Sequence, residues 1–222
     1  LDSCRFFCPV LTKRTPVHRH TPSVWFRVML LVLLAVSGLR PSVGAASEQG
    51  LPLVRHYPAR DYLANPQIFD LAESPDGRLA FVSASFVVWF DGTQWNKLET
   101  QVSNLRSVAV TPSGAIALGG SDDFGLVERD GLGRWAWRSL RSQVPADSGR
   151  LGLVPRVAVV GSDVWFGAER RVFRWTGDRL QHWAFTNGPG RVTVLGAGGG
   201  VWLHRAGEGL FRWGGGQFQP QA

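Results

Sequence analysis

The stretch from Phe69 to Trp95 decides the fold, and it reads FDLAESPDGRLAFVSASFVVWFDGTQW. Short runs of apolar and β-branched residues alternate with Pro75-Asp76-Gly77 and Asp91-Gly92. Glycine at these places can adopt the positive φ that tight turns require. The stretch therefore predicts short strands joined by tight turns.

The same pattern returns three more times along the chain. Each copy consists of a turn residue, any residue, an aliphatic residue, a small residue or Trp, and a large apolar residue. The copies lie at Gly77–Phe81, Gly114–Leu118, Ser162–Phe166 and Gly199–Leu203, with spacings of 37, 48 and 37 residues. A second turn signal follows each copy, at Gly92, Gly131, Gly177 and Gly215, with spacings of 39, 46 and 38 residues. Two anchors that keep one period indicate an internal repeat.

A period of about 40 residues built from strands and turns is typical of β-propeller blades. We predict an all-β protein with about four blades, each a four-stranded antiparallel sheet, over residues 67–222. The repeats cover 67–100, 105–140, 154–183 and 191–218, and the polar stretch 141–150 reads as an inter-blade loop. Because propellers close with 4 to 8 blades and the last repeat lacks the polar character of a terminal cap, we expect an incomplete ring, a fragment of a longer propeller.

The charge of the chain is concentrated near its amino terminus. Of the formal net charge of +7, residues 1–45 carry +5, which leaves +2 for everything that follows. A nearly neutral body gives no reason to expect nucleic acid as a partner. Both cysteines, Cys4 and Cys8, also lie in this leader, so the body is compatible with an oxidising compartment.

The first 66 residues divide into three parts. Residues 1–23 show no periodicity and are expected to be a disordered extension, with a short functional basic tail as the alternative. Residues 24–46 combine Arg27, an apolar run of about nine residues and small residues before a cleavage site near Ala45 or Ala46, which is the pattern of a secretory signal peptide. An uncleaved anchor is the competing interpretation. Residues 47–66 form a lead-in segment in which Leu53–Tyr57 has strand character, and this strand either pairs with the last blade or simply leads in.

Several of these motifs together resemble the two-component regulator propeller repeats. They are Asn65–Asp70 leading into Pro75–Arg78, the segment Phe90–Trp95 near the end of the first repeat, and Gly119-Gly120 followed by Phe124-Gly125. Repeats of that family form the periplasmic sensor region of hybrid histidine kinases, diguanylate cyclases and related regulators. The resemblance covers about Leu53 to Phe218 and weakens in the last two repeats, where Thr176-Gly177 and Gly214-Gly215 replace Asp-Gly. It implies ligand sensing outside the inner membrane, often of a carbohydrate, with a membrane helix and an output domain elsewhere.

The candidate ligand-binding residues are Asp122, Asp123 and Phe124 in the loop 119–125, with Trp95 and Trp135 as aromatic platforms. Loops at the ends of propeller blades are where such folds carry function. The spacing of Asp122 and Asp123 does not match a calcium loop, and a turn-capping role is the alternative. Five other tryptophans recur at strand positions that favour packing between blades: Trp89, Trp165, Trp175, Trp202 and Trp213.

The remaining motifs that could indicate a metal site, a cofactor site or catalysis are better explained by local structure. His56, His182 and His204 lack paired ligand spacing, so no metal site is predicted. The glycines of 196–200 precede another strand-like run instead of a helix, which favours a hairpin turn over a cofactor loop. No cofactor and no catalytic residue are predicted, since the body offers neither a cysteine nucleophile nor a nucleophile-elbow serine.

The sequence thus favours a non-catalytic, periplasmic or extracellular sensor propeller. Its expected partners are an unidentified small ligand, with a carbohydrate as the family-based expectation, and the remainder of the sensor protein or a membrane-bound regulator. Two alternatives stay open: an extracellular carbohydrate-active propeller enzyme and a structural protein-interaction module.

Overall fold

The computed structural model describes residues 54–185 and 191–221. All of these except Val54 belong to one compact unit that begins at Arg55. The predicted extension (1–23), the predicted signal peptide (24–46) and the first part of the lead-in segment (47–53) lie outside the described residues. Within the described residues, no helix combines the length and the apolar character needed to span a membrane.

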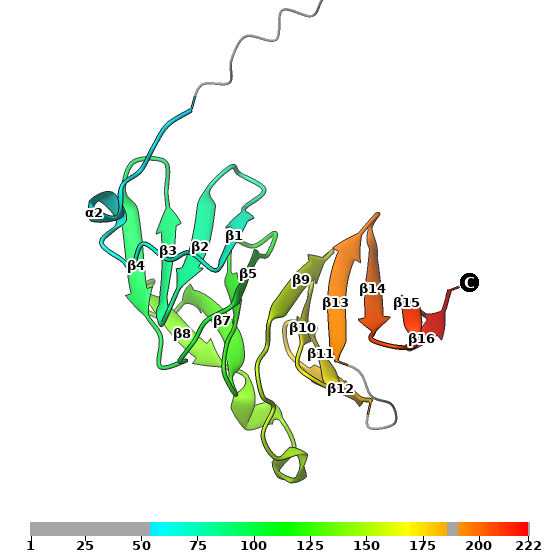
Figure 1. Ribbon diagram of the computed structural model, residues 1–222. Coiled ribbons are helices and arrows are strands. Elements are labelled where there is room, and N and C mark those ends of the chain that lie inside the picture. The colour runs from blue at the N-terminus through cyan, green and yellow to red at the C-terminus, as the bar shows by residue number, and fades with distance from the viewer. Residues whose placement is uncertain (1–53, 186–190, 222) are drawn as a thin grey trace, which may run out of the picture. The chain divides into compact units, whose positions relative to one another are not determined.

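The described chain folds into four antiparallel sheets of four strands, which follow one another in chain order (Figure 1). We refer to these sheets as the first to fourth blades. The first consists of β1 (Asp70–Glu73), β2 (Leu79–Ser83), β3 (Phe86–Phe90) and β4 (Trp95–Glu99). The second consists of β5 (Ser107–Val110), β6 (Ile116–Gly119), β7 (Phe124–Arg129) and β8 (Trp135–Ser139). The third consists of β9 (Arg156–Val160), β10 (Asp163–Gly167), β11 (Arg171–Trp175) and β12 (Leu180–Ala184), and the fourth of β13 (Val192–Ala197), β14 (Gly200–Arg205), β15 (Gly209–Gly214) and β16 (Gln217–Pro220). The predicted all-β architecture of four-stranded blades is confirmed.

The turn glycines act much as the sequence predicts. Gly77 (φ 78°) and Gly114 (φ 84°) each donate a hydrogen bond to the carbonyl oxygen three residues earlier, which closes the turn between the first two strands of a blade. In the second blade, however, the positive φ of the β7–β8 turn belongs to Gly133 (φ 77°) and not to the predicted anchor Gly131. The glycine run near 198 is a two-residue hairpin turn between β13 and β14, with Gly198 and Gly199 both at positive φ.

Successive blades pack face to face, and alternate residues along each strand serve the two faces. In the second blade, Ile116 and Leu118 pack in a core shared with Val82 and Val87 of the first blade. The intervening Ala117, with Phe124 and Leu126, packs in a core shared with the third blade. A further core joins the third blade to the fourth. We call these two sides of a blade its preceding face and its following face.

Four of the five recurring tryptophans pack at blade boundaries, as predicted. Trp89 contacts Trp135 of the second blade, and Trp165 contacts Trp213 of the fourth. Trp175 is buried in the core between the second and third blades. Trp202 differs, because its indole N–H donates to the carbonyl oxygen of Ala197 in its own blade.

Within residues 54–185 and 191–221, no further blade packs on the following face of the fourth blade. The register of β13, β14 and β15 places one set of side chains on this face: Thr193, Leu195, Trp202, His204, Leu210 and Arg212. Leu195 and Leu210 are 43% and 40% exposed, whereas Trp165, which occupies the position of Trp202 in the third blade, is 1% exposed.

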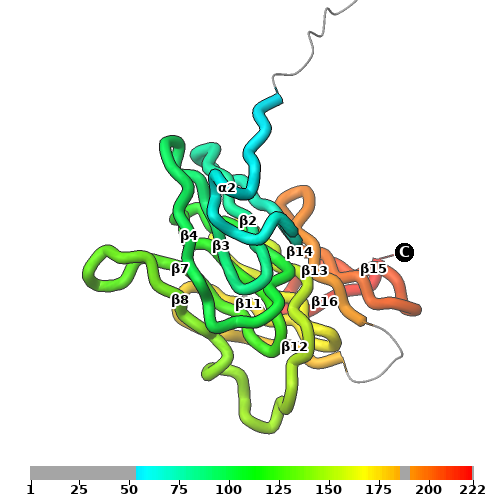
Figure 2. Tube along the Cα trace, turned by 60° about the vertical axis from the view of Figure 1, so that its left-hand side comes forward, coloured from blue at the N-terminus to red at the C-terminus, as the bar shows by residue number. Residues whose placement is uncertain are grey.

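The described part of the lead-in segment packs on the first blade and contains no strand, so the strand expected over 53–57 is wrong for residues 54–57. Instead, α2 (Ala59–Tyr62) lies beside β4 (Figure 1, Figure 2). Tyr57 and Tyr62 pack their rings against Trp95 on the preceding face of that blade, and Lys97 Nζ donates to the carbonyl oxygen of Leu63. Pro58 fixes the backbone just before the helix, and aromatic burial holds the segment in place of strand pairing.

The first strand of each blade lies next to the first strand of its neighbour. Contacts join β1 to β5, β5 to β9, and β9 to β13. These four first strands, which we call the inner strands, therefore stand in a row, and residues at their amino-terminal ends lie around one cavity.

The loop 141–150, expected between blades, contains two short 3-10 turns, η1 (Arg141–Gln143) and η2 (Ala146–Ser148).

Candidate functional site

A cavity of about 420 Å³ lies where these inner strands begin, and we call it the arginine pocket. Its described lining comes from all four blades and the segments that join them: Phe69, Arg106, Leu153, Pro155, Arg156, Glu169, Arg191, Val192 and Thr193. Its size is within the range of small-molecule sites in proteins.

The pocket follows from the repeat itself. Each blade has one residue in its first strand that pairs with the residue five positions after the first turn anchor of the repeat. These structurally equivalent residues are Asp70, Ser107, Arg156 and Thr193. Arg156 and Thr193 line the pocket, together with the residues that precede the four equivalent positions, namely Phe69, Arg106, Pro155 and Val192. Two adjacent structural positions, repeated along the chain, thus supply most of a single concave site.

The described lining is strongly cationic. Three guanidinium groups, from Arg106, Arg156 and Arg191, face one carboxylate, that of Glu169. Arg191 and Glu169 form only a long ion pair of 3.7 Å, with side chains 80% and 47% exposed, so their attraction is screened by water. The charge left over is about two positive charges.

Arg106 lies at the edge of this site, packed on an aromatic ring. Its guanidinium carbon lies 3.7 Å from the centre of the Phe69 ring, which is a close cation–π contact. Its Nη1 atom is buried and has no hydrogen-bond partner within the described part of the chain. A buried donor without a partner is costly, so this group gains free energy from an acceptor.

The loop 119–125, predicted as a ligand site, is bound to the chain that enters the third blade. Asp122 Oδ1 accepts hydrogen bonds from the backbone N–H of Leu151 (2.7 Å) and Gly152 (3.0 Å), and its Oδ2 pairs with Arg150 (2.8 Å). Burial opposes ionisation, but these donors outweigh it and lower the pKa of the Asp122 carboxyl. Asp122 therefore joins two segments of the protein.

The two residues that follow Asp122 point into the structure. Asp123 accepts hydrogen bonds from the Ser139 hydroxyl (2.6 Å) and from the backbone N–H of Phe124 (2.7 Å), and burial raises the pKa of its carboxyl. Phe124 is fully buried between Phe166 and Phe173, with ring centroids 4.6 and 4.7 Å away. Phe124 thus belongs to the core, and a ligand at the surface does not reach its ring.

The predicted aromatic platforms lie apart from the loop and from each other. Trp95 is surrounded by Tyr57, Tyr62, Phe81 and Phe90 on the first blade. Trp135 packs at the first blade boundary and lines a small cavity of about 40 Å³ there. Both rings are half-buried and engaged with other aromatic rings. The structure does not bring the five predicted site residues together.

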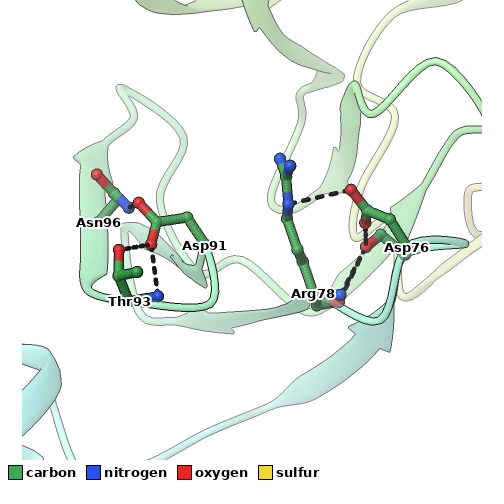
Figure 3. Close-up of polar contacts among 6 residues, drawn as sticks. Asp76, Arg78, Asp91, Thr93 and Asn96 are labelled. Atoms are coloured by element: carbon green, nitrogen blue, oxygen red, sulfur yellow. Dashed lines mark hydrogen bonds and ion pairs between the residues drawn. The ribbon is translucent and has the colours of Figure 1, made fainter.

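Two acidic residues of the motifs that carry the family resemblance, Asp76 and Asp91, hold turns together (Figure 3). Asp91 accepts hydrogen bonds from the backbone N–H groups of Gln94 and Thr93, from the Thr93 hydroxyl and from the Asn96 side chain. These donors, with Gln94 first, hold the pKa of the Asp91 carboxyl far below its usual value. Asp76 likewise accepts a hydrogen bond from Ser74 and pairs with Arg78 at 3.0 Å. These acidic residues serve local structure.

Sequence reasoning missed the arginine pocket. Arg106, Arg156 and Arg191 each stand at or just before the first strand of a repeat, and an alignment of strand starts would have exposed this recurrence. The first anchor of each repeat, a glycine in three copies and Ser162 in the other, lies at the opposite end of those strands. The basic residues therefore looked scattered.

Comparison with known proteins identifies the class through structure alone. No family model matches the chain, and no curated protein matches it in sequence. Its sheets and their packing are those of a β-propeller, and solved propeller structures align with it. Virginiamycin B lyase from Staphylococcus aureus aligns with a TM-score of 0.52 and 13% identity, over 65% of this chain and 51% of the lyase. The chain thus spans about half the length of that enzyme.

The particular likeness expected from the repeats is also present. The extracellular domain of the putative one component system BT4673 from B. thetaiotaomicron aligns with a TM-score of 0.52 and 15% identity, over 68% of this chain and 22% of that domain. The same domain has also been described as part of a putative hybrid two component system. PorZ, a surface component of the type-IX secretion system of Porphyromonas gingivalis, aligns with a TM-score of 0.53 and 14% identity, over 77% of this chain and 30% of PorZ. At these identities the likeness shows a shared fold.

Proposed function

We propose that this chain is the ligand-sensing propeller region of an exported bacterial signal-transduction protein of the two-component or diguanylate-cyclase type. The observation that carries the proposal is the arginine pocket, a concave site to which all four blades contribute. The fold shared with the extracellular domain of BT4673, together with the family resemblance of the repeats, supports a sensory role.

The uncovered face of the fourth blade supports a longer propeller. In the first three blades, the position of Trp202 is filled by Ala80, Ala117 and Trp165, each 2% exposed or less because the next blade covers it. A propeller blade cannot bury its own two faces without neighbours. We propose that at least one further blade packs on Leu195, Trp202 and Leu210, and that a membrane helix and an output domain complete the protein.

The site favours binding over catalysis. Among its described lining residues, Glu169 is the only one with a side chain suited to general acid–base work near neutral pH. A carbohydrate-active enzyme of the usual kind needs two carboxyl groups on either side of the scissile bond. An enzymatic role remains an outcome of the experiment below, as does a purely structural interaction module.

Two measurements test the proposed function. A fusion of residues 1–60 to a phosphatase that is active only after export should give activity in intact bacteria, and the matched Leu31→Arg fusion should lose it. The purified chain should melt at a higher temperature in the presence of at least one member of an oligosaccharide and envelope-extract panel. A fusion inactive like its Leu31→Arg partner would contradict export. If the protein releases new saccharide products and Glu169→Gln abolishes this release, the protein is an enzyme. If the chain folds but binds no member of the panel, the result favours the structural interaction module.

A further inference from the structure

We infer that the arginine pocket binds a small ligand that carries at least two negative charges, of about the size of a disaccharide. This inference rests on the proposed sensing function and names the chemical class that the site recognises. Its basis is the set of three guanidinium groups that the fold gathers at the pocket with one carboxylate, that of Glu169, in the described lining.

Arginines at the surface of this protein are either paired or exposed to water. Arg174, Arg150 and Arg134 pair with Asp163, Asp122 and Asp130 at 2.6, 2.8 and 3.0 Å, whereas others, such as Arg179, are exposed and make no ion pair with a described residue. In the pocket, the side chains of Arg106 and Arg156 make neither a hydrogen bond nor an ion pair with any other described residue.

Two unpaired guanidinium groups at one cavity repel each other, and an anion between them removes that cost. Guanidinium groups present parallel N–H donors that match a carboxylate, sulfate or phosphate group. The cation–π contact between Arg106 and the Phe69 ring favours one position of the guanidinium group, which reduces the entropy lost when a ligand binds. The site is therefore preorganised for negatively charged oxygen atoms.

The remaining lining sets the size and shape of the ligand. The volume of about 420 Å³ accommodates one or two sugar-sized rings, and Leu153, Pro155 and Val192 supply apolar surface. Thr193 adds a hydroxyl group that can donate or accept a hydrogen bond. This combination suits a ring compound with acidic substituents, such as a uronate or a sulfated or phosphorylated sugar.

Binding can be measured on the full chain by titration calorimetry at low ionic strength. The probes are digalacturonate, its uncharged dimethyl ester and inorganic sulfate. We expect saturable binding of digalacturonate or sulfate and none of the ester; the preferred anion distinguishes a carboxylate from a sulfate group. Raising the salt to 0.5 M should weaken the interaction, because the Debye length falls to about 4 Å.

Three variants connect this binding to the pocket. Arg156→Gln and the double variant Arg106→Gln/Arg156→Gln should weaken binding by about ten-fold and about a hundred-fold, because each replaced guanidinium group loses its charge-assisted hydrogen bonds to the anion. Glu169→Gln should strengthen it severalfold, because the one carboxylate in the described lining is removed. Arg179→Gln is the matched control: Arg179 is exposed, lies outside the pocket lining and changes the net charge equally.

The inference is overturned if neither anion binds at millimolar concentration, if the ester binds as well as the acid, or if Arg156→Gln binds like the Arg179→Gln control. Since Arg156 is exposed and unpaired, Arg156→Gln should keep the melting temperature of the wild type, so a loss of binding reports on the pocket. If an uncharged oligosaccharide stabilises the chain while no anion binds, sensing stands and the anionic class fails.

Discussion

Trp165 and Trp213 form an edge-to-face pair across the boundary between the third and fourth blades, with ring centroids 5.0 Å apart. Trp165 also contacts Trp183 and Phe218, so four aromatic rings meet at this boundary. Trp165 is 1% exposed, and Trp213 and Phe218 of the fourth blade contribute to its burial. The pair therefore reports directly on blade packing.

Replacement of this tryptophan should loosen the blade boundary. Trp165→Ala removes a fully buried aromatic side chain, and we expect it to lower the free energy of unfolding by about 3–5 kcal/mol. Trp202→Ala is the matched control, since Trp202 holds the same position on the uncovered face of the fourth blade, and it should cost less than about 1.5 kcal/mol. Urea unfolding followed by circular dichroism measures both. Equal losses for the two variants would contradict the assignment of the two faces.

A glycine inside the second blade should also be sensitive to substitution. A Cβ atom at Gly125 would lie 2.1 Å from the carbonyl oxygen of Arg138 on the adjacent strand. Because that neighbour is backbone, Gly125→Ala must displace β8, and we expect a loss of more than about 2 kcal/mol. Gly131→Ala meets nothing within 4 Å and has no positive φ, so it should be nearly neutral. Thermal melting of the two variants decides; a stable Gly125→Ala protein would show that β7 and β8 are further apart.

Much of this fold was predictable because the repeat is marked by turn residues at regular spacing. Gly77 and Gly114 require a positive φ, and the alternation of apolar residues between them fixes strand length and register. Gly131 shows the limit: Asp-Gly suggested the turn glycine, but Gly133 two residues later takes the left-handed conformation, because the turn closes between Asp130 and Arg134.

The candidate site was not predictable in the same way. Asp122 and Phe124 drew attention through their chemical types, yet one holds two loops together and the other fills the core. Arg106 and Arg156 are 50 residues apart in sequence and meet only because equivalent ends of the inner strands converge. Position around a common centre is a property of the assembled blades, and a linear pattern does not display it.

Loss of the Asp122 carboxylate should weaken the junction between the second and third blades. Asp122→Ala leaves the N–H groups of Leu151 and Gly152 without their acceptor, and we expect a cost of about 1 kcal/mol since the side chain is one-third exposed. The folded pKa lies below the ordinary 3.8, so its stabilising contribution is present above pH 3.8 and is lost as the pH falls through the folded pKa. Stability of the wild type and of Asp122→Ala, measured from pH 6 downward, should converge in the acid range. Parallel curves would contradict a role for the ionised carboxylate.

Asp91 should remain ionised in acid to a lower pH than an ordinary aspartate. Its hydrogen-bond donors, led by the N–H of Gln94 and Thr93, favour the charged form, so the carboxyl should titrate well below 3.8. Carbon NMR of the Asp91 carboxyl group during acid titration measures this directly. The Thr93→Val variant removes one donor and should move the midpoint toward the ordinary value. A wild-type midpoint at 3.8 would mean that the turn is not closed as described.

The lead-in segment should contribute to the stability of the first blade through one aromatic side chain. Tyr62 is 6% exposed and packs edge-on against Phe81, with ring centroids 5.1 Å apart, and against Trp95 at 6.0 Å. Tyr62→Ala should therefore lower the free energy of unfolding by about 3 kcal/mol. Tyr62→Phe should change it by less than about 0.5 kcal/mol, because the ring makes the contact and the hydroxyl group has no hydrogen bond within the described residues. Urea unfolding monitored by tryptophan fluorescence compares the two, and the emission of Tyr62→Ala should shift to longer wavelength as Trp95 gains water. A Tyr62→Ala protein as stable as Tyr62→Phe would show that the segment leaves the preceding face of the first blade free to receive another blade.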